Sequence, residues 1–379
     1  MSEKNLILDY NEKPEKLSQW FFLSFQHVFA MFSATVLVPL LTGLPISTAL
    51  FASGVGTLIY ILCTKGRIPI YLGSSFAYIS YIGAAAAKNG FGMITSYGPA
   101  LTGLVAVGVI YVIVALIIKY VGVNWLNKLL PPVVIGPMIM IIGLGLAPSA
   151  IGQIGLNAEV IEWKYIVVAL VAFLTTALFA VRGKGFLKVI PFLIGIVTGY
   201  VASMILGLVD YTPILNARFF ALPDFYVPFV HYKFDFSAVL TIVPIVLVTL
   251  SEHIGDHKVL SSIIDRDLIE DPGLDRTVMG DGVATAVAAL IGGPANTTYG
   301  ENTSVVGMTK VASVWVIGLA AIIAIVFGFL GKLTAVISSI PAAVLGGVSI
   351  LLYGFISVNG LKILIENKVD FSNTKNVIV

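Results

Sequence analysis

Two glutamates, Glu252 and Glu301, lie where a membrane-spanning chain can least easily accommodate charge. Glu252 follows the apolar run 236–250, which is long enough to enter a bilayer. Glu301 lies in the polar break 292–302, between two apolar segments. A carboxylate at the bilayer centre costs about 2.5–3.5 kcal/mol on insertion scales, and it persists there only when it is paired, protonated or facing water. Intramembrane carboxylates are therefore candidates for a functional site.

The composition is that of a polytopic membrane protein. Of the 379 residues, 58% are hydrophobic and 11% are charged, whereas soluble domains contain about 25% charged residues. The net charge of +2 gives no argument for nucleic-acid binding, and the single cysteine, Cys63, excludes a disulfide framework within one chain. The stretch 1–18 is polar with mixed charge and lacks the pattern of a cleaved signal peptide.

Apolar runs of about 20 residues can cross the hydrocarbon core as helices. The sequence contains twelve such candidates, and Gly, Ser or Thr residues interrupt the short third and tenth ones. The twelve predicted spans cover residues 19–41, 47–64, 70–87, 93–119, 131–150, 164–181, 186–208, 236–257, 276–292, 297–310, 312–331 and 340–362. Gly103, Gly108, Gly143 and Gly145 are interpreted as sites of close helix packing.

The distribution of basic residues predicts the orientation, because Lys and Arg accumulate in cytoplasmic loops. With a cytoplasmic N-terminus, 17 of the 22 Lys and Arg residues fall on the cytoplasmic side. The five assigned to the opposite side are Lys88, Lys164, Arg218, Lys233 and Lys332. We therefore expect a multi-pass protein of the plasma (inner) membrane with its N-terminus in the cytoplasm.

Three recurring landmarks indicate two structural repeats. A polar residue precedes a histidine inside an apolar run at His27 and at His253, and the glycine of a polar break follows 46 and 47 residues later, at Gly73 and Gly300. A Pro with a Gly five residues later opens both the fifth and the twelfth predicted spans. The offset of seven spans is odd, so the second copy enters the membrane from the opposite side. Chance matching of Gly-rich helices is the alternative explanation.

Inverted repeats with interrupted helices at matching places are typical of secondary transporters, whose substrate site lies between the breaks near the bilayer midplane. Two copies of seven spans require fourteen, but the sequence contains twelve, and residues 371–379 resemble the start of another helix. The predicted fold is therefore an all-α polytopic membrane protein of two inverted seven-span repeats. Its last two spans are expected to be missing from this sequence.

The two breaks and the two glutamates define a candidate site. The Gly, Ser and Thr residues of 71–76 and 297–302 suit extended backbone, which is tolerated at this depth only where it lines a cavity or is buried in protein. The half-helices that follow supply N–H donors, while Glu252 and Glu301 supply acceptors, or a donor when protonated. With Phe76 as an aromatic face, this set suits a flat, neutral ring better than an anion.

A buried carboxylate can also carry a proton, because burial disfavours its charged form. Glu252, beside His253, Asp256 and His257, is the better candidate for coupling transport to protons. The alternative for His27 and His253 is simple hydrogen bonding between helices. A metal site is disfavoured, because the order Glu-His-x-x-x-His is not that of zinc proteases and no further ligand cluster stands out. We predict no cofactor.

Four motifs carry a resemblance to a known family. They are Gln-His-Val-Phe-Ala-Met-Phe at 26–32, Tyr-Leu-Gly-Ser-Ser-Phe-Ala at 71–77, Ser-Glu-His-Ile-Gly-Asp-His at 251–257 and Asn-Thr-Thr-Tyr-Gly-Glu-Asn at 296–302. Together they resemble the nucleobase–ascorbate, or nucleobase–cation symporter-2, transporter family. The resemblance extends over essentially the whole chain and looks strongest to the bacterial uracil permeases.

The resemblance implies a proton-coupled uracil symporter that works by alternating access, often as a homodimer in the membrane lipid. It implies a core domain (19–120 and 236–333), a gate domain (121–208 and 334–379), a cytoplasmic tail (1–18) and an extracellular or periplasmic loop (209–235). The alternatives are a permease for xanthine, urate or another purine, and a truncated chain that does not transport. An anion transporter would lack the two carboxylates, and a membrane enzyme would need a nucleophile or metal constellation that the sequence lacks.

The resemblance also implies roles for individual residues. The substrate-binding residues that it implies are Glu252, Glu301, Gly300, Phe76, Ala34 and Tyr299. Glu252 and Glu301 would bind the uracil ring, the backbone amides of Gly300 and Glu301 would contact a carbonyl, Phe76 would stack on the ring, and Ala34 would offer a backbone contact.

The chain departs from the family's pattern at two of these motifs. Asp256 stands where bacterial relatives often have His, so the proton-coupling set here is Glu252, Asp256 and the adjacent His257. Ser304 replaces the glycine of the family signature, so we expect slightly different packing of that helix.

Overall fold

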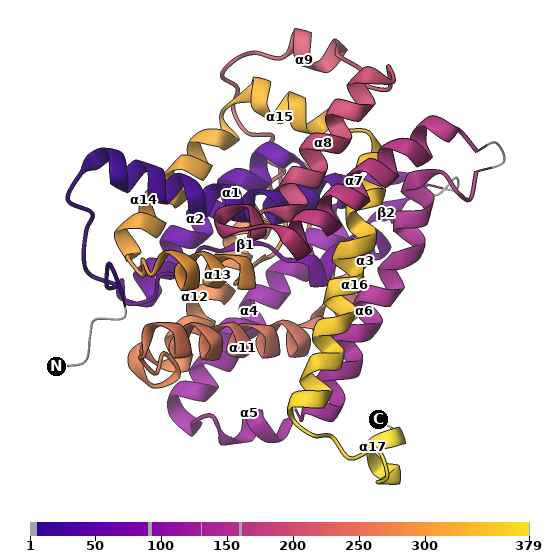
Figure 1. Ribbon diagram of the computed structural model, residues 1–379. Coiled ribbons are helices and arrows are strands. Elements are labelled where there is room, and N and C mark those ends of the chain that lie inside the picture. The colour runs from indigo at the N-terminus through magenta and orange to yellow at the C-terminus, as the bar shows by residue number, and fades with distance from the viewer. Residues whose placement is uncertain (1–5, 90–92, 130, 159–160, 379) are drawn as a thin grey trace. The chain divides into compact units, whose positions relative to one another are not determined.

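The computed structural model describes residues 6–89, 93–129, 131–158 and 161–378. Seven helical segments within these residues are long and apolar enough to cross a membrane. They are α1 (Leu17–Thr42), α2 (Ile46–Cys63), α4 (Gly98–Val121), α6 (Pro132–Ile154), α7 (Trp163–Arg182), the segment Phe236–Ile264 and α16 (Ala342–Glu366) (Figure 1). The expectation of a multi-pass helical membrane protein is thereby confirmed.

The other predicted spans coincide with shorter helices. These are α3 (Ile79–Ala85), α8 (Pro191–Ile205), α12 (Leu274–Leu290), α13 (Gly300–Thr309) and α14 (Val314–Gly328). The segment Phe236–Ile264 consists of η3 (Phe236–Ala238), α10 (Val239–Ile242), η4 (Val243–Ile245) and α11 (Val246–Ile264). Large apolar side chains such as Leu174 and Leu240 remain exposed on these helices, as expected for helices that are apolar on all sides and face lipid.

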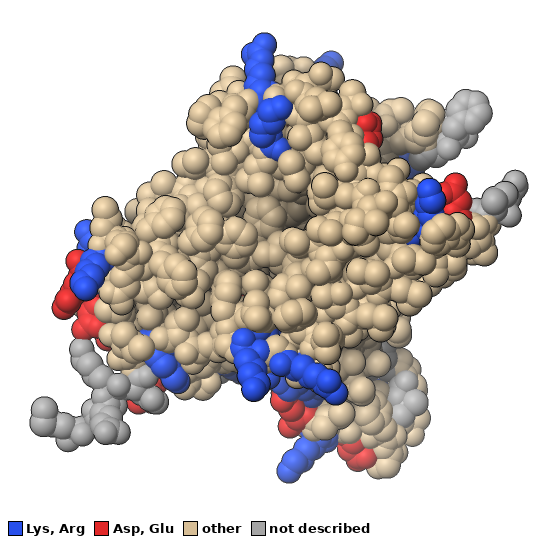
Figure 2. Space-filling view, turned by 45° about the horizontal axis from the view of Figure 1, so that its top comes forward, with Lys and Arg blue, Asp and Glu red and all other residues tan. Residues whose placement is uncertain are grey.

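Short elements complete the described chain. They are η1 (Phe76–Tyr78), α5 (Asn124–Leu129), η2 (Gly185–Lys188), α9 (Thr212–Asn216), η5 (Ile269–Gly273), α15 (Gly331–Ser338), α17 (Thr374–Ile378) and the antiparallel strands β2 (Ala87–Lys88) and β3 (Ile94–Ser96). Of the predicted N-terminal tail, residues 1–5 lie outside the described residues. On the face shown in Figure 2, the Lys, Arg, Asp and Glu side chains form separate groups, and most of the surface between them is uncharged.

The chain divides into two compact units, each made of two chain segments. Unit 1 comprises Met1–Val121 and Tyr211–Ser339, and unit 2 comprises Gly122–Asp210 and Ile340–Val379. In unit 1, α12 packs along α4 and α2, and α14 packs along α2 and α1. In unit 2, α16 packs along α6 and α7, and α7 packs along α8.

Small residues permit the close helix contacts in both units. A Cβ atom on Gly103, Gly108 or Gly143 would come within 2.7, 2.6 and 2.2 Å, respectively, of an atom of a neighbouring helix. The prediction for Gly145 is wrong, because a Cβ atom there would meet nothing within 4 Å. The spacing of glycines within a helix indicates a small-residue face, but it does not tell which glycines a neighbour covers.

The two predicted breaks lie side by side in unit 1, and the chain is non-helical over 71–75 and 297–299. The prediction of extended backbone over 300–302 is wrong, because these residues form the first turn of α13. Strand β1 (Gly73–Ser74) pairs antiparallel with β4 (Asn296–Thr297), so that Gly73 faces Thr297 and Ser74 faces Asn296 (Figure 1). The Ser75 N–H extends the pairing by donating to the Ala295 carbonyl over 2.8 Å. Extended backbone at membrane depth must find partners inside the protein, and here each break supplies them to the other.

Candidate functional site

Glu252 and Asp256 lie on one face of α11, because residues four apart on a helix are neighbours on its surface. Both side chains are half-buried. The Asp256 Oδ2 atom accepts a 2.6 Å hydrogen bond from Thr298 Oγ1, in the break just before α13. No hydrogen bond or ion pair of the Glu252 carboxylate is found within the described part of the chain. Asp256 therefore anchors α11 to the break, and Glu252 stays available to a ligand.

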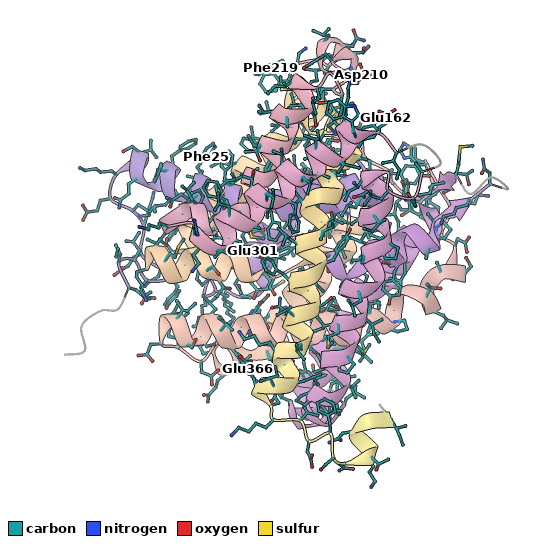
Figure 3. All side chains as sticks on the ribbon, turned by 45° about the vertical axis from the view of Figure 1, so that its right-hand side comes forward. Phe25, Glu162, Asp210, Phe219, Glu301 and Glu366 are labelled. Carbon is teal, nitrogen blue, oxygen red and sulfur yellow. The ribbon has the colours of Figure 1, made fainter. Side chains whose placement is uncertain are left out.

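The N-terminus of α13 presents a backbone donor beside a carboxylate. Tyr299 is the N-cap residue and is extended, with φ −139° and ψ 136°. The first N–H groups of a helix have no intrahelical acceptor. The Glu301 N–H bonds to the Glu301 carboxylate, which leaves the Gly300 N–H for a ligand. Gly300 is exposed, and a Cβ atom there would meet nothing within 4 Å. Glu301 is half-buried in the first turn (Figure 3), where the helix dipole favours a negative charge.

Phe76 and Tyr299 pack against each other at the paired breaks. Their ring centroids are 5.5 Å apart and the rings are almost perpendicular, at 82°. The Tyr299 hydroxyl donates to the Ser74 carbonyl, and Gly73 admits the ring, since a Cβ atom there would be 3.0 Å from Tyr299 Cε2. The Tyr299 hydroxyl is thus used inside the protein, while Phe76 remains half-buried.

Ala34 lies in the uninterrupted helix α1 and is buried in one apolar cluster with Met31, Tyr71 and Tyr299. The backbone N–H and carbonyl groups of Ala34 form the usual hydrogen bonds within this helix. The structure therefore places Ala34 close to Tyr299, without the break in the helix that would free its backbone.

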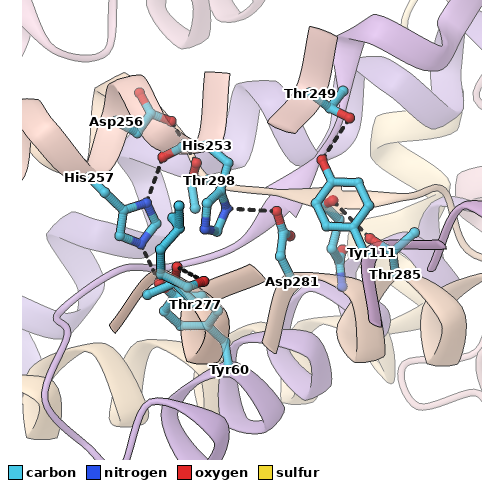
Figure 4. Close-up of polar contacts among 12 residues, drawn as sticks. Tyr60, Tyr111, Thr249, His253, Asp256, His257, Thr277, Asp281, Thr285 and Thr298 are labelled. Atoms are coloured by element: carbon cyan, nitrogen blue, oxygen red, sulfur yellow. Dashed lines mark hydrogen bonds and ion pairs between the residues drawn. The ribbon is translucent and has the colours of Figure 1, made fainter. Parts of the chain in front are cut away.

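The two histidines of α11 face away from Glu252 and Asp256 and are fully buried. His253 Nδ1 lies 2.9 Å from Asp281 Oδ2 on α12. His257 Nδ1 donates to the His253 carbonyl over 2.6 Å, so Nε2 of the neutral ring accepts from the Tyr60 hydroxyl at 2.5 Å (Figure 4). The structure thus brings Glu252 and Asp256 together and directs His257 toward α2 instead.

His27 joins α1 to the site-bearing helix. Its Nδ1 atom lies 2.9 Å from Asn302 Oδ1, and Asn302 Nδ2 donates to the Pro69 carbonyl at 3.2 Å. Asn302 therefore couples the first turns of α13 both to α1 and to the segment before β1. This is the interhelical hydrogen bond that the sequence left open as the alternative for His27.

Sequence reasoning missed several buried polar residues of this region. Asp281 offered a signal, since a lone carboxylate inside a predicted span is a functional candidate by default. Thr249 Oγ1 accepts a hydrogen bond from the Tyr111 hydroxyl at 2.7 Å (Figure 4). The same atom lies 3.1 Å from the Tyr78 hydroxyl. Nothing in the sequence marks these hydroxyl contacts. Among the described residues, no three His, Cys, Asp or Glu side chains are grouped so as to hold a metal ion.

Paired interrupted helices and carboxylates within membrane spans are typical of membrane transport proteins. The chain belongs to the permease family, whose model matches residues 18–379. This confirms the family resemblance that the motifs indicated.

Named relatives resemble this chain over almost its whole length. It is 50% identical to the uracil permease of Bacillus caldolyticus, covering 98% of this chain and 85% of that protein. It is 47% identical to the uracil permease of Bacillus subtilis (strain 168), covering 100% and 87%. It is 44% identical to the uracil permease of Escherichia coli (strain K12), covering 97% and 84%.

Solved transporter structures share the fold. The transmembrane domain of the cyanobacterium bicarbonate transporter BicA matches with a TM-score of 0.67 and 15% identity, covering 94% of this chain and 96% of that one. The structure of SLC26A9 matches with a TM-score of 0.68 and 12% identity, covering 95% and 60%. At these identities the likeness concerns the fold alone.

Proposed function

We propose that this chain is a proton-coupled uracil permease that imports uracil by alternating access. The support from sequence is the 44–50% identity to proteins named uracil permease. The support from structure is the set of groups in unit 1, where acceptors, donors and an aromatic ring converge at two paired breaks.

The pairing of β1 with β4 carries the proposal. It brings Phe76, which follows β1, to the start of α13, which follows β4. Uracil is a flat, neutral ring whose N–H groups and carbonyls alternate. The carboxylates of Glu252 and Glu301 accept from its N–H groups, the Gly300 N–H donates to a carbonyl, and Phe76 stacks on the ring face. Ala34 and Tyr299 line the site from behind.

Proton coupling rests on Glu252. Its carboxylate has no protein partner within the described residues, so its protonation state is free to follow the ligand and the side of the membrane. Asp256, held by Thr298, is the second carboxylate on the same face. His257, the third member of the proposed proton-coupling set, is hydrogen-bonded to the Tyr60 hydroxyl.

We further propose that unit 1 is the core domain and unit 2 the gate domain, and that the two chain segments within each unit belong to the two inverted repeats. The support is that each unit is made of two chain segments, as two interleaved copies require. Most Lys and Arg residues fall in the segments predicted to lie on the same side of the membrane as the N-terminus, which supports an N-terminus in the cytoplasm.

The test is uptake of labelled uracil into cells that lack their own permease. We expect saturable uptake that excess unlabelled uracil abolishes and excess xanthine leaves intact. Uptake of labelled xanthine that uracil does not inhibit would contradict the uracil proposal in favour of a purine permease.

A further inference from the structure

The N-terminal segment that precedes α1 is bound to the connection between α13 and α14. Leu8 forms a parallel bridge with Val311. The Ile7 N–H donates to the Lys310 carbonyl at 2.7 Å, and the Ala312 N–H donates to the Leu8 carbonyl at 2.8 Å. We call residues 7–13 the N-terminal strap.

The strap supplies the acceptors that the start of α14 lacks. Val314 is the first residue of α14, and its N–H has no acceptor within the helix. It donates instead to the Tyr10 carbonyl at 3.0 Å. The N-cap residue Ser313 makes no capping bond to its own helix, and its hydroxyl donates to the Glu12 carbonyl at 2.6 Å. Because Ala312 and Ser313 are buried, losing the strap would leave buried donors unsatisfied, which is costly.

Side chains fix the strap laterally to the loop after α11. The Arg266 guanidinium lies 4.1 Å from the centroid of the Tyr10 ring. Arg266 and Arg67 both pair with Asp271. The Tyr10 ring is therefore linked through Arg266 to η5, which contains Asp271, and to the segment after α2, which contains Arg67. A cation over an aromatic face is attracted by the ring quadrupole.

A second anchor joins the strap to the starts of α1 and α14. Lys13 Nζ lies 4.4 Å from the centroid of the Trp20 ring and 5.9 Å from that of Trp315. The Trp20 indole N–H donates to the Trp315 carbonyl at 2.8 Å. Both ends of the strap are therefore held by residues of unit 1.

The strap matters for the site because α13 is short. Its ten residues, Gly300–Thr309, extend only about 15 Å at 1.5 Å per residue, and isolated helices of this length are marginal. One end is held by Thr298 on Asp256 and by Asn302 on His27. The other end leaves the helix at Lys310, whose φ of 55° turns the chain into the segment that the strap binds.

We propose that the N-terminal strap is a positioning element of the substrate site: by holding the far end of α13, it sets where Gly300 and Glu301 present their groups to the ligand. This inference rests on the proposed function as a uracil permease. Tyr10 acts through α13 and does not touch the ligand.

The test compares Tyr10→Ala with Tyr10→Phe, which keeps the ring over Arg266, and with Asn11→Ala, an exposed neighbour in the same segment. We expect Tyr10→Ala to raise the KM for uracil uptake about fivefold, as expected for an interaction of this kind, with little change in maximal rate per transporter at the membrane. Tyr10→Phe and Asn11→Ala should keep the wild-type KM. Ser313→Ala, which removes the bond to Glu12, should shift KM in the same direction as Tyr10→Ala.

Hydrogen exchange of the purified full chain without ligand gives a second readout. Tyr10→Ala should speed exchange at Ala312, at Val314 and along α13, and Asn11→Ala should not. If wild-type protein transports uracil and Tyr10→Ala and Ser313→Ala leave KM unchanged, the inference is overturned, whatever the exchange result. If the wild-type protein does not transport uracil, the proposed function fails. In that case, hydrogen-exchange rates in Tyr10→Ala that equal those of the wild type would separately overturn the inference that the N-terminal strap positions α13.

Discussion

Thr298 donates a 2.6 Å hydrogen bond to Asp256. This bond joins the break before α13, the helix that carries Glu301, to α11, the helix that carries Glu252. The two helices that bear the proposed ring-binding carboxylates are thus linked by one hydroxyl.

Thr298→Ala should weaken uracil binding about tenfold, because hydrogen bonds to charged groups contribute about 1.5–3 kcal/mol. Thr298→Ser keeps the hydroxyl and should restore binding. Titration of uracil into the purified proteins measures both. Ser262→Ala, an exposed hydroxyl on α11 that bonds only to its own helix, is the matched control. Equal weakening by Ala and Ser would show that the hydroxyl is not what matters.

Glu252→Gln should abolish the response of uptake to an imposed pH gradient, because the amide keeps the size of the side chain but cannot take up and release a proton. Wild-type uptake should rise as the outside becomes more acidic, and uptake by the variant should stay flat. The measurement is initial uptake rate against external pH at constant internal pH. Full gradient-driven accumulation by Glu252→Gln would remove Glu252 from the proton pathway.

Asp281→Ala should lower the free energy of unfolding by about 1–3 kcal/mol, because it leaves the buried His253 Nδ1 without its hydrogen-bond partner. His253 and Asp281 are 0% and 1% exposed. Thermal unfolding in detergent, followed by intrinsic fluorescence, checks the prediction. Glu366→Ala breaks the exposed pair with Lys362 and should change stability by less than about 1 kcal/mol. Equal effects of the two substitutions would contradict the buried pairing.

Gly56→Ala should disturb the paired breaks by displacing Asn296 of β4. A Cβ atom on Gly56 would come 2.0 Å from Asn296 Nδ2, which itself donates to the Ala52 carbonyl. Overpacking of this kind costs about 1–3 kcal/mol, and we expect both a lower melting temperature and reduced uptake. Gly145→Ala, in open space, is the control, and wild-type uptake by Gly56→Ala would show that β4 tolerates the shift.

The seven long apolar helices and the two breaks could be predicted from the sequence because their signals are local. Long apolar runs mark helices, and Gly, Ser and Thr inside short runs mark interruptions, as at Gly73 and Thr297. Glu252 and Glu301 stand out for the same reason, since a charge inside an apolar run is rare.

The partners across helices could not be predicted, because they depend on which face each helix buries. His257 was grouped with Asp256 as its neighbour in sequence, but adjacent residues on a helix point about 100° apart, and the ring contacts Tyr60 instead. The N-terminal strap could not be predicted, because most of its hydrogen bonds come from backbone groups, which leave no pattern in the sequence. The sequence of residues 7–13 therefore predicts only a polar tail.

Proton-coupled uracil uptake can be measured with purified protein in liposomes that are loaded with buffer and given an inwardly directed proton gradient. We predict that labelled uracil accumulates above its external concentration, that collapsing the gradient releases it, and that Glu252→Gln does not accumulate it. Uracil that never exceeds its external concentration, or that accumulates equally without the gradient, would contradict the account.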